Sequence, residues 1–124
     1  MWQDLVVPRA LPVVDTTAPV CCAPMAAGPL DGDAALQIAV RLKALADPAR
    51  VQLMSLLLAD PETGACTCDL APTVALSEAT VSHHLKQLRD AGLVEGTKKG
   101  TNTWYRPQAE ALGALGRVID PECC

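Results

Sequence analysis

The chain has 124 residues, which suits one domain, and half of them are hydrophobic, so it can bury a core of its own. Phenylalanine is absent and aromatic residues make up 2% of the chain, so this core must be built from Leu, Val and Ala. The net charge of −4 argues against an indiscriminate polyanion binder, no apolar run approaches the ~20 residues of a membrane span, and the N-terminus lacks a signal-peptide pattern. We therefore expect a cytoplasmic protein with no membrane partner.

The first 30 residues are predicted to form an extended or disordered arm. They hold five of the ten prolines, a density at which neither helical nor strand periodicity survives. This arm, residues 1–30, carries Cys21 and Cys22. A folded DNA-binding domain is expected over residues 31–120, followed by a cysteine-terminated tail of residues 121–124.

Two helices are predicted before residue 60. The first starts at residues 31–33 and runs to about residue 45; its apolar positions are Leu36, Ile38, Leu42 and Leu45, with Arg41 and Lys43 as polar exceptions. Asp47 then caps a second helix that has Pro48 in its first position. The buried face of this second helix is predicted to comprise Val51, Met54, Leu57 and Leu58.

The next two helices match a helix-turn-helix unit. The first is short, from Cys68 to about Val74, and Pro72 must lie in or near its first turn. The second has Ser77 as its N-cap and stops before Gly92. Its apolar stripe is Val81, Leu85 and Leu88, and its opposite face carries Ala79, Ser82, His83 and Lys86. Such a face suits the major groove of DNA, although an ordinary solvated face has the same composition.

A β-hairpin is predicted next, with strands at residues 93–95 and 101–106 around a turn at residues 96–100. The turn carries two lysines, Trp104 is placed to pack, and Arg106 is placed to reach outward. A basic hairpin directly after a recognition helix is typical of a wing, whereas alone it would be only a solvated turn.

A last helix is predicted at residues 110–119, with Leu112, Leu115 and Ile119 on one face. Two glycines weaken it as an isolated helix. We therefore expect it to need a partner, and a second copy of the chain is the obvious one.

The helix and the hairpin together predict binding to double-stranded DNA. The stretch from Leu76 to Pro107 has five Lys or Arg residues against three acidic residues, so it is locally basic on an otherwise acidic chain. The expected DNA contacts are Ser77, Ala79, Thr80, Ser82, His83, His84, Lys86, Gln87, Lys98, Lys99 and Arg106. For the histidines, groove or phosphate contact is favoured over metal ligation, with His84 facing the helix bundle as the alternative.

The six cysteines form three close pairs, Cys21-Cys22, Cys66-x-Cys68 and Cys123-Cys124. Without a sign of export, a disulfide framework is not expected, and clustered thiols in a reducing compartment more often bind a soft metal or act as redox switches. Cys66 and Cys68 precede a helix, whose free N–H groups favour the thiolate form. Both can bind one ion only if Cys66 lies in irregular backbone before the helix, because side chains two residues apart diverge on a regular helix.

Three segments in order resemble the ArsR/SmtB family of bacterial metal- and metalloid-responsive repressors. They are LKALADPARVQLMSLL, ACTCDLA and LSEATVSHHLKQLRDAGLVEGTKKGTNTWYR, and the match covers about Leu36 to Arg106. The resemblance implies a mainly α fold with a small β-hairpin, a homodimeric winged helix-turn-helix whose first and last helices form the interface. It also implies a repressor, not an enzyme, that leaves its operator DNA when its ligand binds, with Cys66 to Leu70 as a thiolate metal box.

Vicinal cysteines on an N-terminal arm make the chain similar to arsenic-responsive members of this family. Trivalent arsenic or antimony is therefore the expected inducer, with metal ligands drawn from Cys21, Cys22, Cys66 and Cys68. Whether Cys66 or Cys68 completes a three-thiolate site stays open. The alternatives are Cd(II), Pb(II) or Zn(II) bound by all four thiolates, and a thiol redox-responsive regulator.

Two further function classes are disfavoured. A metalloid-handling redox enzyme would need a phosphate-cradling Gly-rich loop or a Cys-x-x-Cys on a βαβ unit, and the sequence has neither. A metal-buffering protein would account for Cys123 and Cys124, to which we assign no essential role, but not for the recognition helix or the wing.

Overall fold

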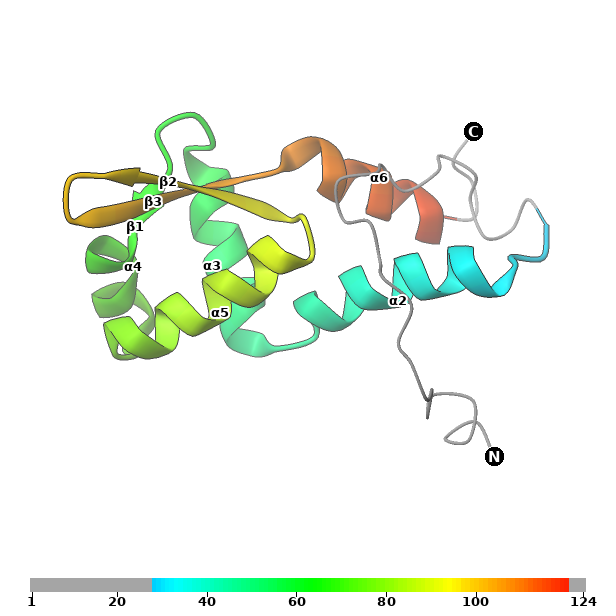
Figure 1. Ribbon diagram of the computed structural model, residues 1–124, viewed down its shortest axis with the longest axis horizontal. Helices are drawn as coiled ribbons and strands as arrows, with labels where there is room; N and C mark the ends of the chain where they lie inside the picture. Colours follow the sequence, from blue (N-terminus) through cyan, green and yellow to red (C-terminus); the bar gives the residue numbers. More distant parts are fainter. Residues whose placement is uncertain (1–27, 121–124) are drawn as a thin grey trace.

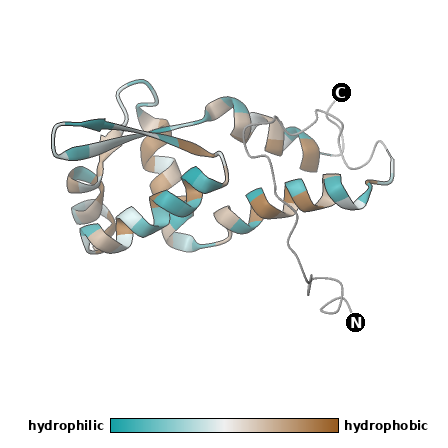
Figure 2. Cartoon of the chain, viewed as in Figure 1, coloured by the Kyte–Doolittle hydropathy of each residue, from teal (hydrophilic) through white to brown (hydrophobic). Residues whose placement is uncertain are grey.

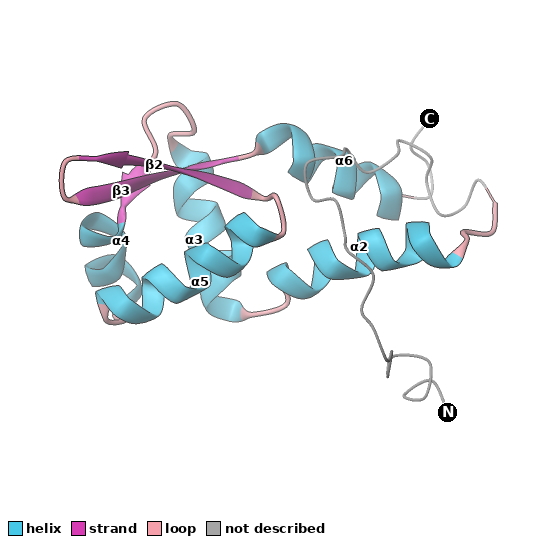
Figure 3. Ribbon diagram, in the orientation of Figure 1, coloured by secondary structure: helices cyan, strands magenta, loops and turns pink. Residues whose placement is uncertain are grey.

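The computed structural model describes residues 28–120. Its elements in chain order are α2 (Gly32–Leu45), α3 (Pro48–Ala59), β1 (Ala65–Cys66), α4 (Thr67–Val74), α5 (Glu78–Asp90), β2 (Val94–Lys99), β3 (Asn102–Pro107) and α6 (Ala109–Ile119). Figures 1 and 3 show that α3, α4, α5 and the small sheet gather at one end, while α2 and α6 lie side by side at the other. The predicted mainly α fold with a β-hairpin is confirmed.

The helix start predicted at residues 31–33 and the predicted N-cap Asp47 are confirmed. Oδ1 of Asp31 accepts a hydrogen bond from the backbone N–H of Ala34 at 2.8 Å. Oδ1 of Asp47 accepts one from Ala49 at 2.8 Å, directly before Pro48 at the first position of α3. These bonds satisfy N–H groups that have no partner inside the first turn, which is why short polar residues mark helix starts in the sequence.

The main core lies between α3, α4, α5 and the strands. The predicted stripe of α5 is confirmed, because Val81, Leu85 and Leu88 are all 0% exposed. Leu53 and Leu93 are equally buried and belong to the same cluster. Each of these side chains stabilises the fold by about 1.5–3 kcal/mol through burial.

The predicted buried face of α3 is partly wrong. Met54 and Leu57 are buried, but Val51 is 55% and Leu58 45% exposed, and Leu53 is buried instead. Helix α3 is apolar almost all round, so periodicity cannot select its inward face. Its packing against α4, α5 and β3 makes that selection.

A second, smaller cluster joins α2 to α6. It consists of Ile38, Ala114, Leu115 and Val118. The predicted face of the last helix is wrong in part, because Ile119 is exposed and Leu112, half-buried, packs against the main core instead. Ala114, which was not among the predicted residues, takes an inward position in this cluster.

The sheet has the order β1-β3-β2, with both pairs antiparallel. The predicted turn at residues 96–100 is wrong, because β2 and β3 extend to the pair Lys99–Asn102 and only two residues connect them. Gly96 lies within β2, where a Cβ would come 3.1 Å from Cε1 of Tyr105. Glycine at this position therefore makes room for the Tyr105 ring instead of forming a turn.

Helix α4 also differs from its prediction at Pro72. This proline is the sixth residue of the helix and so lies in its second turn, not its first. Proline there removes one N–H, which would otherwise donate to the carbonyl of Cys68. The helix ends at Ala75, whose φ of 58° is in the left-handed region and turns the chain into α5.

The distribution of hydropathy matches this division into two packed parts. Figure 2 shows hydrophobic residues along α3 and α6 and a hydrophilic tip on the β2–β3 hairpin. Among the described residues, no helix combines the length and the apolar character that crossing a bilayer would require.

Candidate metal centre and nucleic-acid interface

Helix α5 presents a polar face to solvent. Ser77 caps its start, where the Ser77 hydroxyl accepts from the backbone N–H of Thr80 at 3.1 Å. The predicted contact residues Ser77, Ala79, Thr80, Ser82, His83 and Lys86 are all exposed, while His84 and Gln87 are half-buried. Small and donor-bearing side chains thus occupy the face opposite the buried stripe, which is what close approach to base edges and phosphates requires.

His84 differs from its neighbour His83. Its Nδ1 accepts a hydrogen bond from Nε of Arg50 at 3.1 Å, so this ring is turned toward α3. The alternative prediction, that His84 faces the helix bundle, matches this contact. Sequence reasoning missed Arg50, and nothing in the spacing of 34 residues could have paired the two side chains.

The hairpin after α5 has a basic, exposed tip. Lys98 and Lys99 are exposed, and Nζ of Lys99 lies 5.5 Å from the ring centroid of Trp104, a cation–π arrangement. Trp104, predicted to pack, is half-buried beneath this lysine, whereas its neighbour Tyr105 is the buried residue of β3. The two residues differ because adjacent side chains of a strand point to opposite faces.

Arg106 points outward as predicted, but an acidic residue partners it. Its guanidinium forms an ion pair with Glu95, and Glu95 also accepts from Nε2 of Gln108 at 3.1 Å. Both charged side chains are roughly half exposed, so the pair contributes little to stability. It does reduce the positive charge that Arg106 presents, which leaves the two lysines as the main cations of the hairpin.

The Cys66-x-Cys68 segment forms a tight turn at the start of α4. Cys66 is the N-cap, with extended φ and ψ of −91° and 166°, and Cys68 is the second residue of the helix. This is the irregular backbone that binding of one ion by both cysteines requires. Cys66 is 1% exposed, whereas Cys68 is exposed. The turn therefore has one sulfur anchored in the core and one at the surface.

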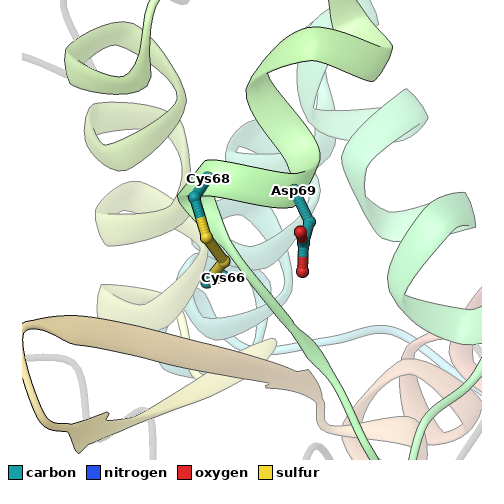
Figure 4. Close-up of side chains that lie close together, drawn as sticks. All are labelled: Cys66, Cys68 and Asp69. Atoms are coloured by element: carbon teal, nitrogen blue, oxygen red, sulfur yellow. A yellow bond between two sulfur atoms is a disulfide. The ribbon is translucent and has the colours of Figure 1, made fainter.

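The two sulfurs are joined as a disulfide, which the sequence analysis did not expect (Figure 4). The extended N-cap brings their Cα atoms to 5.2 Å, inside the range that a disulfide spans. A thiolate, not a disulfide, is a metal ligand, so soft-ion binding belongs to the reduced form of this pair.

Asp69 adds a carboxylate to the turn. One ligand atom each of Cys66, Cys68 and Asp69 lie within 4.8 Å of one another, and Figure 4 shows the carboxylate beside the two sulfurs. Sequence reasoning did not include Asp69, although its position directly after Cys68 was a signal that could have been used. The donor set of two sulfurs and one oxygen suits a soft or borderline ion.

The other predicted ligands, Cys21 and Cys22, lie outside the described residues, as do Cys123 and Cys124. The predicted arm, apart from residues 28–30, and the predicted tail lie outside them as well. Their roles therefore stay predictions.

The cysteine turn contacts both elements of the expected DNA interface. Cys66 is the register partner of Trp104 across β1 and β3. Thr67, between the cysteines, donates from its hydroxyl to Oε1 of Glu78, in the first turn of α5, at 3.5 Å. A conformational change at this turn would therefore act directly on a residue of the hairpin and on a residue of the exposed helix.

These features define a class of protein: a winged helix-turn-helix DNA-binding regulator, with α4 and α5 as the helix pair and β2–β3 as the wing. Residues 47–96 match the family described as "Bacterial regulatory protein, arsR family". The chain is 38% identical over 100 residues to the "Putative arsenical resistance operon repressor ArsR2" of Halobacterium salinarum, with 81% of each chain covered. It is 36% identical over 80 residues to a cadmium resistance regulatory protein CadC homolog of Staphylococcus aureus, with 64% of each covered.

The chain therefore belongs to the ArsR family of transcriptional repressors and is not an enzyme. Among solved structures, it is similar to the AntR antimony-specific transcriptional repressor, with a TM-score of 0.61, 28% identity, and 72% of this chain and 79% of that chain covered. It is also similar to a homodimeric winged helix-turn-helix DNA-binding domain from Mycobacterium bovis, with a TM-score of 0.55, 33% identity, and coverage of 73% and 80%.

Proposed function

We propose that this protein is a metalloid-responsive repressor that binds operator DNA as a homodimer and dissociates when cysteine thiolates capture As(III) or Sb(III). The observation that carries the proposal is the position of the Cys66–Cys68 turn, directly between the wing and the recognition helix. An inducer bound there touches both DNA-reading elements at once.

The donor chemistry favours a trivalent metalloid. Arsenous acid exchanges each of its three hydroxyl groups for a thiolate, and each exchange takes the proton of one thiol and releases one water. We assign two of the three sulfurs to Cys21 and Cys22 of the predicted arm, from the same or the partner subunit, and the third to Cys66 or Cys68 of the turn. Cys66, Cys68, Cys21 and Cys22 are thus the proposed ligands, and the reducing cytoplasm is the compartment in which they stay thiols.

The proposed DNA interface is the exposed face of α5 together with the wing. The residues proposed to approach the major groove are Ser77, Ala79, Thr80, Ser82, His83, His84, Lys86 and Gln87, and those proposed to approach the flanking phosphates are Lys98, Lys99 and Arg106. A dimer would present two such faces to half-sites about one DNA turn apart. We place the dimer interface on α2 and α6, which pack together within one chain and still expose Leu42 and Ile119 at their surface.

Release follows from where the inducer binds. Coordination that draws an N-terminal arm onto the cysteine turn moves Cys66 and Thr67 relative to their partners Trp104 and Glu78. The two recognition helices of a dimer fit successive half-sites only in one relative orientation. A bound inducer that disfavours this orientation lowers the affinity of the dimer for DNA.

One observation favours a second candidate, a thiol redox-responsive regulator. The disulfide between Cys66 and Cys68 is the oxidised form that such a regulator would use. In that case two thiols give up two protons and two electrons to an oxidant such as hydrogen peroxide, which is reduced to two waters. Cd(II), Pb(II) or Zn(II) held by four thiolates is the other alternative.

A DNA-release assay separates these candidates. Fluorescence anisotropy of a labelled duplex with an imperfect inverted repeat is followed while As(III), Sb(III), Cd(II), Pb(II), Zn(II) or hydrogen peroxide is added to the reduced full-length protein. We expect release by As(III) and Sb(III) at lower concentrations than by the divalent ions. The Cys22→Ser variant is expected to bind DNA but not to release it.

The matched control is Cys123→Ser/Cys124→Ser, which is expected to respond like the wild type. If this control loses release while Cys22→Ser keeps it, the proposed site is wrong. Release by peroxide alone would replace the metalloid proposal with the redox one.

A further inference from the structure

The side chain of Arg50 links three helices. It belongs to the first turn of α3, is half-buried, and makes two side-chain hydrogen bonds. Its Nε donates to Nδ1 of His84 on α5 at 3.1 Å, and its Nη1 donates to the carbonyl oxygen of Ala44, in the last turn of α2, at 3.3 Å. One guanidinium therefore ties the end of α2 to the recognition helix.

The hydrogen bond from Arg50 determines which ring nitrogen of His84 carries a hydrogen. A guanidinium can only donate, so Nδ1 of His84 must be an unprotonated acceptor. A neutral imidazole with a bare Nδ1 carries its hydrogen on Nε2. Nε2 of His84 is thus a hydrogen-bond donor, and it can donate to a phosphate oxygen or to an acceptor on a base edge.

We infer that Arg50 is a positioning residue for operator binding: it holds His84 in the Nε2–H form and sets the recognition helix α5 against the end of α2. The inference rests on the proposed contact of α5 with DNA. Arg50 itself lies behind α5 and is not among the proposed contacts.

Arg50 lies between α2, a helix of the proposed dimer interface, and α5, the helix proposed to contact DNA. Helix α2 packs with α6 within the chain through Ile38, Ala114, Leu115 and Val118, and these two helices carry the proposed dimer interface. Helix α5 carries the DNA-reading face. Because Arg50 reaches the last turn of α2 with one nitrogen and α5 with another, it constrains the angle between the dimer helices and the reading helix.

A planar fork suits this task better than a point charge. Arg50 bonds two acceptors at once from Nε and Nη1, whose relative geometry is fixed. A lysine would keep the charge but could not serve both acceptors in this geometry. Arg50→Lys is therefore expected to weaken DNA binding, even though it is a conservative change.

The first test is spectroscopic and independent of DNA. The chain has two histidines, so a long-range ¹⁵N–¹H spectrum of the side chains at pH 8 contains two rings, assigned with His83→Gln. We expect Nδ1 of His84 to have the shift of an unprotonated nitrogen in the wild type and an averaged tautomer shift in Arg50→Met. An unchanged His84 spectrum in Arg50→Met would overturn the inference.

The second test measures operator affinity. Arg50→Met is expected to lower the operator affinity by about tenfold or more. The control Arg89→Met, an exposed arginine on α5, should lower it by clearly less. His84→Asn keeps an acceptor near Nδ1 for Arg50 but has no donor at the Nε2 position, and His84→Gln keeps a donor near Nε2 but no acceptor for Arg50. Both variants should therefore bind the operator more weakly than the wild type. The double variant Arg50→Met/His84→Gln should bind no more weakly than Arg50→Met, because both changes break the same bond.

Equal affinities of Arg50→Met and Arg89→Met, or a wild-type affinity of His84→Gln, would overturn the inference. Circular dichroism verifies that each variant folds, and Arg50→Lys replaces Arg50→Met if the latter does not. Failure of the wild type itself to bind a duplex would instead overturn the proposed function, while the spectroscopic test would still decide whether Arg50 controls His84.

Discussion

Cys66 and Trp104 are directly paired across strands β1 and β3. The same Trp104 ring lies 5.5 Å from Nζ of Lys99 at the tip of the wing. A buried cysteine of the proposed inducer site is thus the strand partner of Trp104, whose ring lies close to a basic residue of the proposed DNA interface. This relationship gives the inducer site a short physical connection to the wing, through a strand pair and not through a long chain of contacts.

Trp104 should therefore report inducer binding by its fluorescence. The chain has two tryptophans, and Trp2→Phe leaves Trp104 as the single emitter. We expect arsenite to quench this emission in the reduced protein, saturating at one ion per site. The response should be absent in Cys66→Ser/Cys68→Ser. Quenching that persists in that variant would place the bound ion elsewhere.

The wing lysines should contribute to DNA affinity through phosphates. Lys98→Ala is expected to weaken binding to operator and non-operator duplexes alike, and to reduce the slope of log affinity against log salt by about 0.9 if it removes one phosphate contact. Lys98→Ala/Lys99→Ala should reduce that slope by about twice as much. Lys43→Ala, an exposed lysine on α2, is the control and should leave it unchanged. A slope that does not move in the double variant would exclude the wing from the interface.

The inward face of α3 can be checked by stability. Leu53 is 0% exposed and Val51 is 55% exposed. Leu53→Ala should lower the free energy of unfolding by about 3 kcal/mol, through lost burial and the cavity that remains. Val51→Ala should cost less than about 0.5 kcal/mol. Urea denaturation measures both, and equal losses would show that the side chain of Val51 is covered after all.

Gly64 and Gly100 provide a second matched pair. Both have positive φ, 73° and 65°, which costs a residue with a Cβ about 1–2 kcal/mol. At Gly64 the Cβ would also overlap the carbonyl oxygen of Tyr105, whereas at Gly100 it would meet open space. Gly64→Ala should therefore destabilise the protein clearly more than Gly100→Ala. Equal melting temperatures for the two variants would contradict the close approach of the residue-64 loop to β3.

Local chemistry made much of the fold predictable from the sequence. Caps such as Asp31, Asp47 and Ser77 form bonds within three residues of themselves, so their signal is contained in short segments. The stripe of Val81, Leu85 and Leu88 was equally clear, because α5 has one apolar face and one polar face. The ArsR-family motifs and the close spacing of Cys66 and Cys68 could also be read directly, whereas the disulfide between these two residues was not expected.

Only the tertiary structure decided which of several apolar or polar groups meet. The apolar α3 offered more than one inward face, and contact with α4, α5 and β3 selected Leu53 over Val51. Arg50 and His84, 34 residues apart, form a hydrogen bond that no local pattern encodes. The same holds for Cys66 beside Trp104, since a strand register between distant segments depends on packing of the whole sheet. Sequence thus determined the helices, their caps and the reactive groups, and the folding of distant segments onto one another determined which of those groups can act together.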